Sequence, residues 1–323
     1  MPGVNELRLN KSDFPSINTI SHQRKILKQL KKSTGLYILL FPTLLYVIVF
    51  LYFPMYGVII AFKKYNPTLG ILGSEWVGLK YLIDFVTAYN FKQLLTNTLM
   101  LSIYGFAVGF PIAIIFALML HYSVSDKLKR VVQTISFAPH FISTVVMVGI
   151  LQVFLADQSG LVNVILKELG LKPIRFLGSA PLFRHVYVWS DVWQHTGWNA
   201  IIYLAVLTNV DPSLHEAAII DGANKIKRIW YIDIPAIMPT IITLLLLGIG
   251  NIMSIGFEKA FLMQNNLNIQ ASEIIATYVY KIGLLGAQFS FSTAVGLFNS
   301  VINFILLITV NFLSKKTIGR GIW

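Results

Sequence analysis

The chain has 323 residues, of which 55% are hydrophobic and only 12% are charged. A soluble domain carries about 25% charged residues, so this chain lacks the polar surface to cover its own core, and its composition requires a lipid bilayer. Membrane proteins collect Lys and Arg on cytoplasmic loops, which accounts for the net charge of +12 without a nucleic-acid partner. The absence of cysteine excludes disulfides, thiol chemistry and Cys-ligated zinc.

Long apolar segments predict an all-α polytopic membrane protein, because crossing a bilayer takes roughly 20 apolar residues. Six segments qualify, at residues 36–61, 95–120, 133–156, 185–208, 237–260 and 291–313. The fourth is interrupted by polar residues, and the fifth ends at Glu258 and Lys259. Gly105 and Gly109 in the second segment allow another helix to approach its backbone closely. We expect that other helix to belong to the same chain.

The distribution of basic residues orients these six segments. Most of the 26 Lys and Arg residues fall on residues 1–35, on two short connections near 127–130 and 225–228, and on residues 314–323. The positive-inside rule therefore places both termini and these connections in the cytoplasm. The longer loops on the other side run over 62–94, 157–184 and 261–290. They are either contact surfaces for an external partner or solvated connectors with interfacial aromatic residues.

The cytoplasmic loop 211–239 has the clearest local signals. Pro212 cannot continue the preceding helix, and we expect Ser213 as N-cap of a short helix with Glu216 closing a capping box. Gly222 permits the left-handed turn that ends this helix, and a basic, amphipathic stretch follows. Such a helix–glycine–helix unit is either a docking surface with small side chains or an ordinary interfacial connector.

The sequence of this loop resembles the EAA motif of permease subunits in bacterial ATP-binding-cassette importers. Glu216-Ala217-Ala218, Gly222 and Ile232-Asp233-Ile234-Pro235 stand at the motif's spacing, with Ile234 in place of Leu as the one departure. Asp221 and Ala223 fit the form common in sugar importers. The resemblance extends over the whole chain and implies a type I importer permease fold, with the six spans at 36–313 as the permease domain.

The resemblance implies that this loop is the coupling helix that docks on a separate ATPase subunit. The residues it assigns to that contact and its support are Ser213, Glu216, Ala217, Ala218, Asp221, Gly222 and Ala223. It further implies a second permease subunit, two ATPase copies that bind ATP and Mg²⁺, an extracellular solute-binding protein and a location in the bacterial cytoplasmic membrane. This chain itself is expected to bind no cofactor.

Two further segments resemble permeases that import oligosaccharides, including fragments of plant and algal polysaccharides. They are Phe53-Pro54-Met55-Tyr56-Gly57 with the following Gly73–Leu79 stretch, and the closing Gly319-Arg320-Gly321-Ile322-Trp323. No phosphate-binding loop is present, since Gly73 to Gly78 is followed by Leu79 and not by Lys. No HExxH, GxSxG or paired-carboxylate pattern is present either, so we expect no catalysis by this chain.

Polar residues within the fourth and fifth segments are candidates for the substrate pathway, because such groups are costly in lipid and tend to line water or a path. They are Asp191, Trp193, Gln194, His195, Trp198, Asn199, Asn251 and Glu258. The tryptophans offer ring faces on which a sugar could stack. The alternative is that these groups only make hydrogen bonds between helices or meet interfacial water.

A secondary transporter or channel driven by an ion gradient is the alternative function. That class typically has inverted repeats with ionisable residues near the bilayer centre in both halves. Here such residues concentrate in the fourth segment and no repeat is evident, so the sequence favours the importer permease.

Overall fold

The computed structural model describes residues 33–318 and divides the chain into two compact units, Met1–Gly57 and Val58–Trp323. Most of the predicted cytoplasmic segment 1–35, and the end of the predicted tail 314–323, lie outside the described residues.

The described part of the first unit is helical throughout. α2 (Thr34–Val47) continues through a π-helical stretch, η1 (Ile48–Tyr52), into α3 (Phe53–Met55). None of these residues is buried within the chain, and Leu39 and Phe53 are about three-quarters exposed. A helix that is apolar on every side and has no buried face requires lipid around it, so this segment has the character expected of the first span. The apolar run extends through η2 (Tyr56–Phe62).

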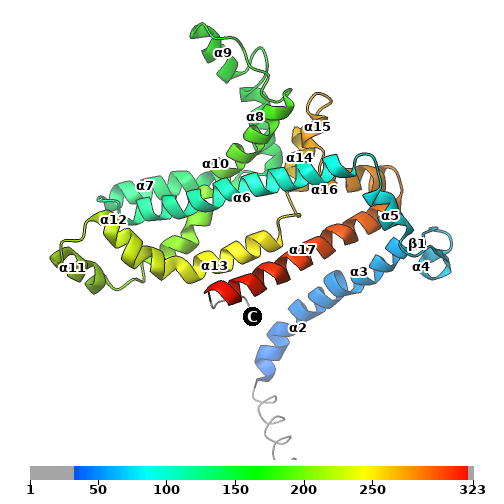
Figure 1. Ribbon diagram of the computed structural model, residues 1–323, viewed down its shortest axis with the longest axis horizontal. Helices are drawn as coiled ribbons and strands as arrows, with labels where there is room; N and C mark the ends of the chain where they lie inside the picture. The colour runs from blue at the N-terminus through cyan, green and yellow to red at the C-terminus, as the bar shows by residue number, and fades with distance from the viewer. Residues whose placement is uncertain (1–32, 319–323) are drawn as a thin grey trace, which may run out of the picture. The chain divides into compact units, whose positions relative to one another are not determined.

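Two long helices form the centre of the second unit. α6 (Phe91–His121) packs along α10 (Ala180–Leu207) more extensively than any other pair of described elements. A Cβ added at Gly105 or Gly109 would lie 4.0 Å from Val188 or 3.7 Å from Val192. These glycines therefore serve packing within the chain, as expected. α13 (Ile234–Gly250) and α17 (Phe289–Ile318) pack against each other beside this pair (Figure 1).

The predicted third span is broken in the structure. α7 (Asp126–Phe137) and η3 (Ala138–Phe141) lead into α8 (Thr144–Phe154) through a bend of 100°. The break has a local cause, because Pro139 interrupts the helix, Ile142 has extended backbone and Ser143 caps α8 by accepting a hydrogen bond from the Val146 N–H. The predicted third segment, 133–156, therefore consists of helices joined at a sharp break and not of a single continuous helix.

The predicted fifth span also has different limits. A continuous helical run begins at α12 (Lys225–Arg228), passes through η4 (Ile229–Asp233) and ends with α13 at Gly250, ten residues before the predicted end. Two glycines and Asn251 end the helix, and α14 (Phe257–Met263) is a separate element. Glu258 and Lys259 therefore lie on a short helix after the span.

Four described helices have the length and hydropathy to cross a membrane, or five if the bent pair counts as one. α10 spans 28 residues but is outside this set, since polar residues interrupt its apolar run. The prediction of a largely helical, membrane-spanning chain is confirmed, whereas a count of six spans is not.

The connections contain several short elements. They are β1 (Lys63–Lys64), paired antiparallel with β2 (Glu75–Trp76), and the helical segments α4 (Gly70–Gly73), α5 (Lys80–Val86), α9 (Leu161–Glu168), α11 (Pro212–Ile220), α15 (Ile269–Ser272), α16 (Ile275–Val279) and η5 (Tyr280–Leu285). Figure 1 shows α11 and α12 at one end of α6, and α5 and α16 at its other end. This separation agrees with the alternation of sides that the basic residues predict.

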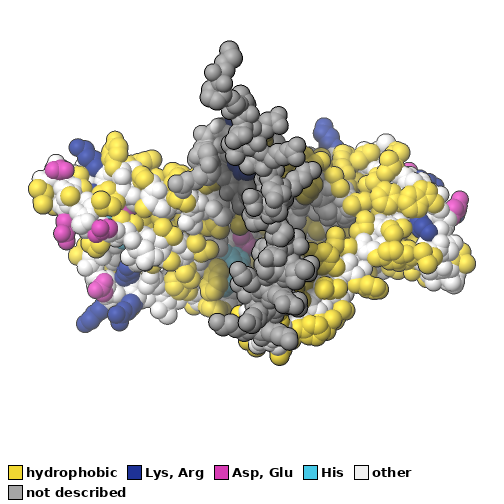
Figure 2. Space-filling model, turned by 90° about the horizontal axis from the view of Figure 1, so that it is seen from below, with side chains coloured by type: hydrophobic (Ala, Val, Ile, Leu, Met, Phe, Trp, Pro, Cys, Tyr) yellow, Lys and Arg dark blue, Asp and Glu magenta, His cyan; other side chains and the backbone are white. Residues whose placement is uncertain are grey.

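Three hydrophobic clusters hold the second unit together. One joins α6, α8, α10 and α14, a second joins α6, α10 and α13, and a third joins α5, α6, α16 and α17. Many large apolar side chains on the outside of the helices remain exposed, as lipid-facing surfaces require. On the face shown in Figure 2, Lys, Arg, Asp and Glu side chains gather toward the left and right ends of the view.

Candidate functional site: the polar cavity and helix α11

A cavity of about 790 Å³ lies among α6, α10, α13 and α14. α6 contributes mainly small and aromatic residues to its wall, while α10 and the segment after α13 contribute polar ones. The polar lining comprises Ser102, Thr144, Asp191, Gln194, His195, Asn199, Asn251, Glu258 and Lys259, and the aromatic lining comprises Phe106, Phe110, Tyr187, Tyr203 and Phe257. A cavity that combines apolar walls with a few polar groups is typical of a small-molecule site.

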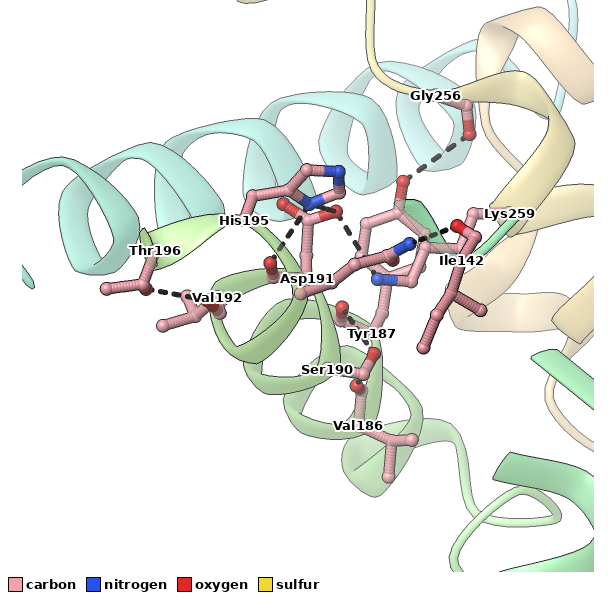
Figure 3. Close-up of polar contacts among 11 residues, drawn as sticks. Ile142, Val186, Tyr187, Ser190, Asp191, Val192, His195, Thr196, Gly256 and Lys259 are labelled. Carbon is pink, nitrogen blue, oxygen red and sulfur yellow. Dashed lines mark hydrogen bonds and ion pairs between the residues drawn. The ribbon is translucent and has the colours of Figure 1, made fainter. Parts of the chain in front are cut away.

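Asp191 is the centre of the polar network in this cavity. Its carboxylate Oδ1 lies 3.4 Å from Lys259 Nζ and 3.4 Å from His195 Nδ1, so that it lies between the two groups (Figure 3). The Asp191 side chain is 50% exposed because it faces the cavity, whereas that of Lys259 is only 7% exposed. Lys259 therefore depends on Asp191 for a counter-charge, since an unpaired buried cation is costly.

Tyr187 supports this pair from one turn earlier in α10. The Lys259 ammonium lies 4.9 Å from the centre of the Tyr187 ring, which is within the range of a cation–π contact. The Tyr187 hydroxyl donates a hydrogen bond to the Gly256 carbonyl at 3.4 Å, and this contact links α10 to the turn before α14 (Figure 3). The network thus fixes a short helix from one part of the chain against a long helix from another.

Gln194 lines the cavity and also has a structural contact. Its side-chain N–H donates to the carbonyl of Ile142 at 2.8 Å, where the chain bends between η3 and α8. This bond satisfies a backbone acceptor that the broken helix leaves free. The interpretation of Gln194 as a group that joins helices therefore has direct support, alongside its place in the cavity wall.

The structure brings six of the eight predicted pathway residues to the cavity wall. They are Asp191, Gln194, His195, Asn199, Asn251 and Glu258. The two tryptophans are not among the described residues of that wall, and Trp193 is 56% exposed. Trp198 stacks on His140, with ring centres 4.2 Å apart. Their roles in a pathway stay predictions.

Lys259 is the charged residue of the site that the sequence-based prediction missed, and the uncharged Ser102 and Thr144 were missed as well. Lys259 follows Glu258 directly, at the end of the fifth predicted segment. Its position at the end of an apolar run was the available signal, because an ionisable residue at such a place usually has a partner. Only the packing of α14 against the rest of the unit shows that the partner is Asp191.

Helix α11 carries the residues assigned to the coupling contact. Its N-cap is Asp211, whose Oδ1 accepts a hydrogen bond from the Ser213 N–H at 2.9 Å. The prediction of Ser213 as N-cap with Glu216 at N3 is therefore wrong, because Pro212 already occupies the first helical position, which suits its fixed φ and missing N–H. Hydrogen bonding to the Ser213 N–H lowers the pKa of Asp211.

The end of α11 follows the prediction. Gly222 has a φ of +78°, a conformation that non-glycine residues rarely adopt. The Ala223 N–H donates to the Ala218 carbonyl at 2.8 Å and the Gly222 N–H to that of Ile219 at 3.0 Å. These two bonds are the Schellman arrangement, which terminates a helix and reverses the chain.

α11 has no buried residue. Glu216 and Ala217 are exposed, Ala218 is half-buried, and Ile219 and Ile220 expose 54% and 86% of their surface. A helix of this kind, with small and apolar side chains on its outside and a connection on either side, is an available docking surface.

Comparison with known proteins identifies the family. The family described as "Binding-protein-dependent transport system inner membrane component" matches residues 109–319. The chain belongs to this family. Members are transport permeases and not enzymes, and the membership together with the apolar helices makes the chain an inner membrane protein.

Relatives match along nearly the whole chain. Protein LplB of Bacillus subtilis (strain 168) is 44% identical over 91% of this chain and 92% of its own length. The polygalacturonan/rhamnogalacturonan transport system permease protein YteP of the same strain is 42% identical over 93% of this chain and 94% of its own length.

A solved structure has the same fold. A chain from a bacterial ABC transporter that imports the acidic polysaccharide alginate superimposes with a TM-score of 0.83 at 35% identity, covering 91% of this chain and 99% of that one. In a second structure, the alginate transporter is in complex with an alginate-pentasaccharide-bound periplasmic protein, with a TM-score of 0.84 at 34% identity. The fold is therefore that of an ABC importer permease.

Proposed function

We propose that this chain is one permease subunit of an ATP-driven importer for oligosaccharides, with fragments of plant or algal polysaccharides as the substrate class. The observation that carries the proposal is α11, an exposed helix that ends in a Schellman turn and presents Glu216, Ala217 and Ala218 on a chain of this family. Small side chains allow the backbone of another protein to approach closely.

The partners follow from this assignment. A second permease subunit completes the translocation pathway, and two copies of an ATPase bind ATP and Mg²⁺ and receive α11. A solute-binding protein delivers the sugar to the side opposite α11. In this arrangement residues 1–35 and 314–323 lie on the cytoplasmic side, flanking the permease domain 36–313, and the chain itself binds no cofactor.

The substrate class is supported by the relatives and by the cavity. YteP is named as a permease for polygalacturonan and rhamnogalacturonan, and the structural neighbour belongs to a transporter involved in the import of alginate. The cavity offers amide, carboxylate, ammonium and aromatic groups, and sugars present both hydroxyl groups and apolar ring faces. We propose that this cavity lies on the path of the sugar, with Asp191, His195, Asn199, Asn251 and Glu258 beside it.

Movement of α11 would drive transport. When the ATPase subunits close on ATP, the docked helices move with them, and the spans change between inward-facing and outward-facing arrangements. Such alternating access is a two-state equilibrium that ATP and loaded binding protein bias through their different affinities for the two states.

The test is coupling in the reconstituted importer. Glu216→Arg is expected to abolish stimulation of ATP hydrolysis by loaded binding protein and to weaken co-purification of the ATPase. Asp126→Arg is the matched control, because Asp126 is another exposed acidic residue and lies on α7, outside α11. Unchanged stimulation and co-purification in Glu216→Arg would contradict the coupling role.

The substrate is tested in the same preparation. Labelled oligogalacturonate, mannuronate oligomers and a neutral maltooligosaccharide are supplied with the binding protein, and uptake into proteoliposomes is measured. Uptake of none of these sugars, with ATPase docking intact, would contradict the oligosaccharide assignment while leaving the permease assignment in place.

A further inference from the structure

Three ionisable side chains meet beneath α11, outside the cavity described above. His121 is the last residue of α6, His215 lies on α11 and Asp233 ends η4. One nitrogen from each histidine and one Asp233 oxygen all lie within 4.8 Å of one another. Residues from three separate segments thus converge on one point, next to the helix assigned to ATPase docking.

The two closest atoms of this group have unmet bonding capacity. Asp233 is fully buried, and its Oδ1 and the His215 Nε2 are buried without a hydrogen-bond partner among the described residues. Buried polar atoms are nearly always bonded in folded proteins. A carboxylate with one free oxygen directed at two imidazoles is a common donor set for a transition metal, because imidazole and carboxylate both bind zinc.

One of the distances in this cluster already matches a tetrahedral metal site, and a second is about half an ångström longer. With bonds of about 2.0–2.2 Å, neighbouring ligand atoms around zinc lie roughly 3.3 Å apart. His215 Nε2 lies 3.3 Å from Asp233 Oδ1, and His121 Nε2 lies 3.9 Å from the same atom. His121 is at the end of its helix, so only a small approach of its side chain completes three ligands.

The supporting contacts are those of a metal site. The Tyr122 hydroxyl donates to the other oxygen of Asp233, Oδ2, at 2.6 Å, and this bond leaves Oδ1 directed at the histidines. Second partners of this kind orient metal ligands and strengthen binding.

Access and a fourth ligand come from a neighbouring pocket. A pocket of about 420 Å³ is lined by His121 and His215, together with Lys129 and Glu216, whose charges balance. A water molecule from this pocket can occupy the fourth position, and an ion can enter by the same path.

We propose that His121, His215 and Asp233 form a binding site for a divalent transition metal of the zinc class, which ties α11 to the end of α6 and the start of α13. Bound metal would hold the docking helix in one position relative to the spans. This site goes beyond the permease function and does not depend on which sugar is carried.

Metal binding to the purified importer tests this proposal. The full-length chain is purified with its partner subunits through an affinity tag that contains no histidine. Zn²⁺ retained after dialysis is measured by mass spectrometry, and titrated Co²⁺ is followed by the visible absorption of tetrahedral cobalt. The wild type is expected to bind one ion at this site per chain.

His215→Gln and Asp233→Asn are expected to remove that ion, and Tyr122→Phe to weaken its binding by about tenfold or more. His140→Gln is the matched control, because His140 stacks on Trp198 away from the cluster and its loss is expected to leave binding unchanged. The difference between wild type and variants excludes ions bound by partner subunits.

If Asp233→Asn fails to fold, His121→Gln replaces it, because the His121 side chain is 21% exposed and easier to alter. No saturable Co²⁺ binding in the wild type, or binding in His215→Gln and His121→Gln equal to the wild type, would overturn the proposal. The cluster would then be a set of histidine–aspartate ion pairs only.

Discussion

The docking helix and the polar cavity are built by different means. α11 is defined by residues close to one another in sequence: Asp211 caps it, and Gly222 and Ala223 close it. The cavity depends on contacts across the chain, since Asp191 and Lys259 are 68 positions apart in the sequence and Gln194 and Ile142 are 52 positions apart. The docking helix α11 is therefore stabilised by contacts between neighbouring residues. The polar cavity forms only when several helices have packed together.

This difference predicts different responses to substitution. A change in the cavity region should reduce the stability of the whole second unit, because it disturbs contacts between helices. A change in α11 should leave that unit folded and reduce coupling to the ATPase, because α11 buries none of its residues. The predictions below test this separation, from the largest effect on stability to the smallest.

Gly197→Ala should have the largest effect. A Cβ at this position in α10 would lie 2.3 Å from the backbone oxygen of Ser136 in α7. Backbone atoms cannot turn aside as a side chain can, so α7 and α10 must separate, and we expect a loss of about 3 kcal/mol from overpacking. Thermal unfolding of the purified chain in detergent measures the effect.

Gly296→Ala is the matched control for Gly197→Ala. No atom lies within 4 Å of a Cβ at that position in α17, and alanine favours a helix more than glycine does, so the unfolding temperature should stay equal or rise. Equal unfolding temperatures for the two variants would contradict the close approach of α7 and α10.

Asp191→Asn should come second. It leaves the buried Lys259 ammonium without a counter-charge, and breaking such a pair is strongly destabilising. Because Asp191 is half-exposed to the cavity, solvent reduces the effect, and we expect about 2 kcal/mol. ATPase co-purification should persist, whereas sugar uptake should fall.

A second substitution tests the cause. Lys259→Met in the Asp191→Asn background removes the unpaired charge and should restore most of the unfolding temperature, because replacing both members of a buried pair costs less than replacing one. If the double variant is no more stable than Asp191→Asn, the ion pair is not what holds α14 against α10.

The separation of local from long-range structure also explains what the sequence could predict. The apolar helices, the end of α11 at Gly222 and six of the cavity residues follow from composition and local patterns. The bond from Gln194 to Ile142, at the point where the third predicted span breaks, and the pairing of Lys259 with Asp191 both depend on the packing of separate helices. Neither contact has a sequence spacing that marks it.

One local feature was also missed. Both Asp211 and Ser213 are good N-cap residues, and the Ser-x-x-Glu pattern favoured Ser213. The structure uses Asp211 because Pro212 fits the first helical position and lengthens the helix at its start. Competing caps two residues apart cannot be separated by pattern alone.

Gly222→Val should come third in its effect on stability. Valine is β-branched and rarely adopts the φ of +78° observed here, so we expect strain of about 1–2 kcal/mol and a changed path between α11 and α12. The unfolding temperature should fall slightly, whereas stimulation of ATP hydrolysis by loaded binding protein should fall strongly.

Gly222→Asn is the control, because asparagine tolerates this conformation. Coupling lost equally in both variants would indicate a contact at Gly222 rather than a need for the turn.

Asp211→Ala should have the smallest effect on overall stability, confined to the first turn of α11. The cap bond to the Ser213 N–H disappears, so hydrogen–deuterium exchange of peptides covering α11 should quicken while exchange in α6 and α10 stays unchanged. Asp211→Asn keeps an acceptor oxygen but not the charge, so at neutral pH its exchange should lie between that of Asp211→Ala and that of the wild type.

The pH dependence of this cap has a definite sign. Hydrogen bonding to the Ser213 N–H lowers the pKa of Asp211 from its ordinary value of 3.8, so the ionised cap stabilises α11 fully above that pH and loses its contribution as the pH falls below it. Compared at each pH, wild-type α11 should lose its extra protection over the Asp211→Asn variant as the solution becomes more acidic, so that the two exchange rates converge. A constant ratio between the two across that range would show that the charge of Asp211 adds nothing to the cap, and that α11 is held by its neutral hydrogen bonds alone.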